Sequence, residues 1–117
     1  MNMTHKSNIS IDVIMDETRI PESINWRASD STADMDQKAK AMMLAFWDGA
    51  DKTALRIDLW TKEMMVDEMA DFYYQVFMTM ADTFQRATNQ PDITANMKAY
   101  AQQFMKEFRA GQLKENQ

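Results

Sequence analysis

The sequence predicts an α+β domain in which a small antiparallel or mixed sheet of two to three strands carries three helices packed on one face. Three observations lead to this class. Apolar residues recur with a period of two in three segments, and with a period of about 3.6 in three others. The chain also has only two glycines and two prolines, which disfavours a turn-rich all-β fold. The expected order of elements is β-β-α-β-α-α.

Two strands are expected near the N-terminus. From Asn8 to Asp16 and from Ser23 to Ala28, apolar residues alternate with polar ones, as in strands that bury one face. Pro21 separates the two segments, and it cannot donate a ladder hydrogen bond. The side chains expected to face the core are Ile9, Ile11, Val13, Met15, Ile24, Trp26 and Ala28.

The third expected element is a helix of about four turns that begins within residues 30–37 and ends before Gly49. Ser31 or Thr32 is expected to cap it, and Asp34 favours the positive end of its dipole. Trp47 lies beside the apolar stripe and is expected at the edge of the core. The stripe itself consists of Met35, Ala39, Met42, Met43 and Phe46.

A third strand is expected from Leu55 to Trp60, followed by two helices. The first helix begins near Met65 and runs for about six turns, and Asn89 and Pro91 are expected to stop it, because asparagine tolerates a left-handed cap and proline cannot continue a helix. The final helix opens at Asp92 or Thr94, with Gly111 as its C-cap.

The bulk composition limits the classes of partner. A chain of 117 residues is expected to form one domain, residues 1–117, with residues 1–7 and 112–117 as disordered tails. The net charge is −5 without a cluster of Lys and Arg, so no nucleic-acid partner is expected. The apolar run Ala41–Trp47 is too short to span a bilayer and no signal peptide is evident, which predicts a cytoplasmic protein without direct membrane insertion.

Few residues offer catalytic chemistry. The chain has no cysteine and one histidine, His5, which lies in the expected N-terminal tail, and its two glycines are isolated. Thiolate and histidine-based nucleophilic catalysis and phosphate-binding loops are therefore disfavoured, and no cofactor, metal or catalytic residue is predicted. A carboxylate pair facing a cleft stays open as an alternative, because any two acids can meet across a cleft.

The candidate site lies around the third strand. Leu55, Ile57 and Leu59 share the expected core side, whereas Arg56, Asp58 and Trp60 share the other side, beside the acids Glu63 and Asp67. Tryptophan and arginine are enriched among the residues that dominate protein interfaces. Two interpretations of Trp60 fit the alternation equally: the following helix covers it, or it is exposed as an anchor for another protein. Arg56, Asp58, Trp60, Glu63 and Asp67 are the candidate partner-binding residues.

With these segments assembled, the chain resembles the gliding-motility protein GldC family of Bacteroidetes. The resemblance lies in DETRIPESINW (16–26), AKAMMLAFWD (39–48), LRIDLWTKEM (55–64), VDEM (66–69) and TMADTFQRAT (79–88). It implies a cytoplasmic accessory protein of the gliding machinery, which is linked to type IX secretion, and it implies no known reaction. The family has a proline just before VDEM where this chain has Met65, so one helix-start signal is missing.

The leading hypothesis is a non-enzymatic interaction protein of the gliding or secretion apparatus, whose partner is another protein of that machinery. Two alternatives belong to other classes. One is a small ligand-binding or carboxylate-based enzymatic domain, and the other is a self-associating structural protein that forms a homo-oligomer. Most of the 13 methionines fall in the apolar stripes and are interpreted as core-filling residues.

Overall fold

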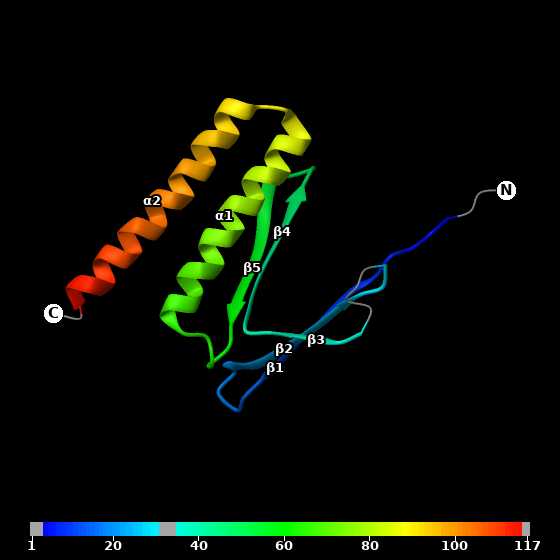
Figure 1. The fold of residues 1–117 in the computed structure, drawn as a ribbon. Helices are drawn as coiled ribbons and strands as arrows, with labels where there is room; N and C mark the ends of the chain where they lie inside the picture. Colours follow the sequence, from blue (N-terminus) through cyan, green and yellow to red (C-terminus); the bar gives the residue numbers. More distant parts are fainter. Residues whose placement is uncertain (1–3, 31–34, 116–117) are drawn as a thin grey trace. The chain divides into compact units, whose positions relative to one another are not determined.

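The computed structural model describes residues 4–30 and 35–115, and the chain divides into two compact units, Met1–Met64 and Met65–Gln117. Within the described residues, the first unit contains five strands and the second contains two helices (Figure 1). The α+β class is confirmed. The prediction of three helices is wrong, because the segment before Gly49 that was expected to be helical contains strands. The strands form two small antiparallel sheets instead of one.

The first sheet has the order β1-β2-β3 and contains β1 (Ile9–Met15), β2 (Pro21–Ala28) and β3 (Gln37–Ala39). Its central strand places Ile24 between Val13 of β1 and Ala39 of β3. Ile24 is only 1% exposed, and Trp26 on the same face is half-buried. The predicted alternation of the two N-terminal strands therefore positions the best-buried side chain of this unit.

The second sheet is the hairpin of β4 (Ala41–Asp48) and β5 (Thr53–Trp60). Its first strand occupies the segment that was predicted as a helix ending at Gly49, and that prediction is wrong. The Asp48 carboxylate accepts the backbone N–H of Ala50 at 2.9 Å, and the Asp48 carbonyl accepts that of Lys52 at 2.8 Å. These bonds form a tight turn after Asp48, in which Gly49 is a turn residue and not a helix stop. The predicted helix caps at residues 31–34 lie outside the described residues.

A single residue, Lys40, connects β3 to β4. The two strands run in different directions (Figure 1). The carbonyl of Lys40 accepts both the backbone N–H of Thr61 at 2.8 Å and its hydroxyl at 3.0 Å. Thr61 is buried, so its side chain has lost water and gains these protein partners instead. The end of β5 is thereby fixed to the corner between the two sheets.

The second unit is a hairpin of two helices, α1 (Val66–Thr88) and α2 (Pro91–Glu115). Helix α1 begins next to Met65 without the proline of the family pattern; Glu68 instead accepts the Met65 backbone N–H at 3.1 Å. It ends as predicted at Asn89, which has a left-handed φ of 51°. Helix α2 starts at Pro91, one residue before the earliest predicted start, because proline fits the first turn of a helix.

The predicted end of α2 at Gly111 is wrong. The helix continues to Glu115, so residues 112–115, which were expected in a disordered tail, are helical. Gly111 has no positive φ, and a glycine without that conformation does not form the left-handed cap that usually ends a helix.

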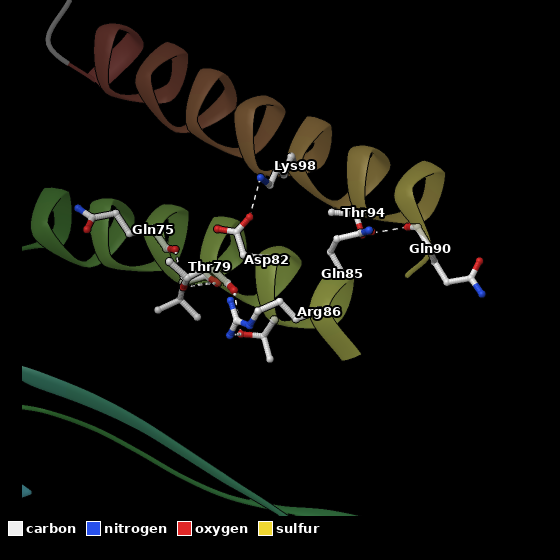
Figure 2. A network of polar contacts seen from close by, with 10 residues as sticks. Gln75, Thr79, Asp82, Gln85, Arg86, Gln90, Thr94 and Lys98 are labelled. Carbon is white, nitrogen blue, oxygen red and sulfur yellow. Dashed lines mark hydrogen bonds and ion pairs between the residues drawn. The ribbon is translucent and has the colours of Figure 1, made fainter. Parts of the chain in front are cut away.

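Two small side chains lie where the two helices pack against each other. Ala81 and Ala101 are fully buried, which allows the helix backbones to approach closely. Two polar contacts cross the hairpin (Figure 2): Lys98 Nζ lies 2.7 Å from Asp82, and the Thr94 hydroxyl lies 2.9 Å from the side-chain oxygen of Gln85. Because Thr94 is buried, this second contact helps to fix the register of α2 against α1.

Candidate functional site

The register of β4 and β5 gives this hairpin two chemically different faces. Directly paired residues point to the same side of an antiparallel sheet, and successive residues alternate. One face, named the aliphatic face below, carries Met42, Leu44, Phe46, Leu55, Ile57 and Leu59, with Asp48 and Thr53 at its turn end. The opposite face, named the tryptophan face below, consists of Ala41, Met43, Ala45, Trp47, Ala54, Arg56, Asp58 and Trp60.

An ion pair lies in the middle of the tryptophan face. Arg56 and Asp58 are two residues apart on β5 and point the same way, and the guanidinium donates to both carboxylate oxygens, at 2.9 and 3.1 Å. Both side chains are exposed, so the pair contributes little stability, about 0–1 kcal/mol. Its two-point geometry holds one positive and one negative group in fixed positions on an open surface.

The two tryptophans lie toward opposite ends of this face. Trp47 is paired with Ala54, and Trp60 with Ala41. Alanine is too small to cover an indole ring from the neighbouring strand, and Trp47 and Trp60 are 68% and 59% exposed. Within the first unit, the neighbouring strand therefore leaves Trp60 uncovered. Trp47, expected at the core edge, is a surface residue that the sequence interpretation missed.

The remaining candidate residues lie elsewhere. Glu63 is exposed in the turn closed by the Met64 N–H and the Thr61 carbonyl at 3.1 Å. Asp67 belongs to the second unit, where it accepts the backbone N–H of Glu68 at 3.0 Å in the first turn of α1. The structure thus brings together Arg56, Asp58 and Trp60, and the interface role of all five residues stays a prediction.

A second polar cluster joins the β1–β2 turn to the end of β5. Asp16 accepts the backbone N–H groups of Thr18 and Ile20 at 2.8 and 2.9 Å, and it lies 2.5 Å from Lys62 Nζ. The ammonium of Lys62, aided by the Ile20 and Thr18 donors, holds the pKa of Asp16 well below its ordinary value. Conversely, the Asp16 carboxylate raises the pKa of Lys62.

This cluster bears directly on the carboxylate-enzyme alternative. Asp16 and Glu22 both line an open hollow of about 500 Å³ beside the turn, and Lys62 Nζ also lies 3.8 Å from Glu22. A general acid needs a raised pKa so that it holds a proton near neutral pH. Asp16 has the opposite shift, which does not suit it to act as a general acid near neutral pH. Its ion pair with Lys62, named the clamp below, joins the β1–β2 turn to the segment after β5.

The clamp predicts a specific pH dependence. Because the pKa of Asp16 is lowered on folding, its contacts stabilise the fold above the unfolded pKa of ~3.9, and this stabilisation is lost as the pH falls. Because the pKa of Lys62 is raised, its contacts stabilise the fold below the unfolded pKa of ~10.4, and this stabilisation is lost as the pH rises. We therefore expect Asp16→Asn to reduce the free energy of unfolding between about pH 5 and 9, with a deficit that shrinks toward pH 2. Urea unfolding followed by tryptophan fluorescence, with the exposed Asp12→Asn as control, measures this. A deficit that stays constant from pH 9 to 2 would contradict the clamp.

Two features are absent from the described part of the chain. Among its residues, no group of three or more His, Asp or Glu side chains is placed to hold a metal ion. Likewise, neither α1 nor α2, as far as the structure describes them, combines the length and apolar character that crossing a bilayer requires.

Comparison with known proteins gives a family match. A family model described as gliding motility-associated protein GldC-like matches residues 21–110, a range that runs from the first residue of β2 into α2. Neither the curated proteins nor the solved structures yield a significant match.

Proposed function

We propose a role for this chain, which belongs to the GldC-like family of gliding motility-associated proteins. It is a non-enzymatic cytoplasmic accessory protein. Its partner is another protein of the Bacteroidetes gliding machinery or of the linked type IX secretion system. The binding surface is the tryptophan face of the β4–β5 hairpin. The observation that carries the proposal is the pair of exposed tryptophans on either side of the Arg56–Asp58 ion pair.

The physical reason lies in what each side chain gains on binding. A tryptophan covers about 150–250 Å² of surface and loses little conformational entropy when it is fixed. Trp47 and Trp60 leave most of this area in water, which is costly unless another surface removes it. The exposed Arg56–Asp58 pair between them adds a fixed pattern of charge, which favours partners with a complementary pattern.

Affinity recovery from native cells tests this proposal. The tagged chain and its Trp47→Ala and Trp60→Ala variants are produced in a gliding Bacteroidetes cell, crosslinked, recovered and analysed by mass spectrometry. We expect the native chain to recover a component of the gliding or secretion machinery, and each variant to recover about tenfold less of it.

The matched control is Leu113→Ala, which removes a similarly exposed apolar side chain, 67% exposed, from α2. Its recovery of the partner should equal that of the native chain. Equal recovery by both tryptophan variants would remove the tryptophan face from the interface, and recovery of no motility or secretion component would count against the proposed role.

A further inference from the structure

The outer edge of β5 has a defined set of backbone groups. In the described residues, β4 is the one strand that pairs with β5. The Thr61 N–H donates to Lys40 of the adjoining strand, and backbone groups of successive residues point to alternate sides of a strand. The odd-numbered residues of β5 therefore bond to β4, and the even-numbered residues present their N–H and C=O groups at the outer edge. These residues are Ala54, Arg56, Asp58 and Trp60.

We propose that this edge pairs antiparallel with the same edge of a second copy of the chain, about a twofold axis that passes beside Ile57. In this register Arg56 lies opposite Asp58 of the second copy, and Asp58 lies opposite Arg56 of the second copy. The same register sets Trp60 opposite Ala54. All of these are even-numbered residues, so the backbone groups that meet are those that point away from β4.

The charges of Arg56 and Asp58 favour this register over the two nearest alternative registers. Only shifts that keep even-numbered residues opposite one another preserve the backbone bonds, so the nearest alternatives centre the twofold axis on Arg56 or on Asp58. The first places two arginines opposite each other, and the second places two aspartates opposite each other. Like charges in directly paired positions are destabilising, and opposite charges are stabilising. The Arg56–Asp58 order along the strand is thus self-complementary under a twofold axis.

Two features distinguish this edge from that of β1, which is also the end strand of its sheet. β1 contains one charged side chain, Asp12, so pairing between two copies cannot form an opposite-charge pair there. β5 has no proline and no lysine between Thr53 and Trp60, which are the residues that commonly protect an edge strand from pairing. The edge of β5 is therefore suited to a second copy in both backbone and charge.

The association goes beyond the proposed function, because it concerns the purified chain alone. Pairing through β5 joins two hairpins into a four-stranded sheet with the order β4-β5-β5-β4. The tryptophan faces of both copies then lie on one side of that sheet, and the aliphatic faces lie on the other, because the paired residues share a face.

A charge-swap experiment tests the register. Sedimentation velocity over a dilution series should show a monomer–dimer equilibrium for the native chain. Arg56→Asp alone and Asp58→Arg alone each place like charges opposite one another, so each should dimerise at least about tenfold more weakly. An equimolar mixture of the two variants restores both opposite-charge pairs between copies, and native mass spectrometry should detect mainly the mixed dimer.

The mixture also separates association from folding. Each variant loses the Arg56–Asp58 pair within its own strand, and mixing cannot restore that pair, so recovery of the dimer reports only the contact between copies. A native chain that stays monomeric throughout the series would overturn the proposal. So would variants that dimerise as strongly as the native chain, or a mixture that forms no mixed dimer. None of these outcomes depends on a gliding partner, so the proposed function is tested separately.

Discussion

Replacing Ile24 by alanine is expected to lower the free energy of unfolding of the first unit by about 2–5 kcal/mol. Ile24 is 1% exposed in the central strand of its sheet, with Val13 and Ala39 as its cross-strand neighbours. Truncation removes buried apolar atoms and leaves a cavity, and the ladders on both sides of β2 limit how far the strands can close it. No other single truncation in this unit removes so large a fully buried side chain among the described residues.

Tryptophan fluorescence measures this effect, because all three tryptophans lie in the first unit. With a urea slope of about 1 kcal/mol per M, the midpoint should fall by about 2 M or more. The matched control is Ile9→Ala on β1, where the side chain is 73% exposed and the expected loss is about 1 kcal/mol or less. Similar shifts for the two variants would contradict the central position of Ile24.

The strands β1, β2 and β5 could be predicted because the alternation that marks them is local. Each has a run in which every second residue is apolar, and this pattern fits an extended chain with one buried face. The placement of Arg56, Asp58 and Trp60 on one face of β5 follows from the same alternation. The exposure of Trp60 within the first unit does not follow from this alternation, since it depends on Ala41, the residue opposite it in β4.

The segment Ala41–Asp48 shows where sequence interpretation fails. Both faces of this strand are largely apolar, with Met42, Leu44 and Phe46 on one side and Met43 and Trp47 on the other. Such a run has no strict period of two, and methionine, leucine and alanine all favour helices. Pairing with β5 overrides that local preference. The helix prediction also led to the wrong expectation for Trp47. Its place on the tryptophan face, opposite Ala54, follows only once β4 is recognised as a strand.

The clamp of Asp16 and Lys62 could not be predicted for a different reason. The two residues are far apart in the sequence, and neither lies in a motif that specifies the other. Their contact depends on the β1–β2 turn and on the end of β5 reaching the same corner of the first unit, which the bond between the Lys62 N–H and the Pro21 carbonyl at 3.3 Å also supports. Contacts of this kind arise from topology, which residue periodicity does not encode.

Phe77→Ala is expected to have the largest effect in the second unit, about 3 kcal/mol of unfolding free energy. The half-buried ring of Phe77 contacts three other rings, at centroid distances of 6.0 Å to Tyr73, 5.8 Å to Tyr100 and 5.3 Å to Phe104. All three contacts have edge-to-face geometry, which adds about 0.5–1.5 kcal/mol per pair beyond burial. One truncation therefore removes the shared member of all three edge-to-face pairs.

The ring geometry also predicts an order among variants. Tyr73 contacts both Phe77 and Phe104, whereas Tyr100, which is more exposed, contacts Phe77. The loss should therefore decrease from Phe77→Ala to Tyr73→Ala to Tyr100→Ala, and the exposed Ile93→Ala should change stability least. Because α1 and α2 are the helices of the described chain, ellipticity at 222 nm during urea unfolding follows this unit. If Phe77→Ala lost no more stability than Ile93→Ala, the aromatic cluster would not be what holds the two helices together.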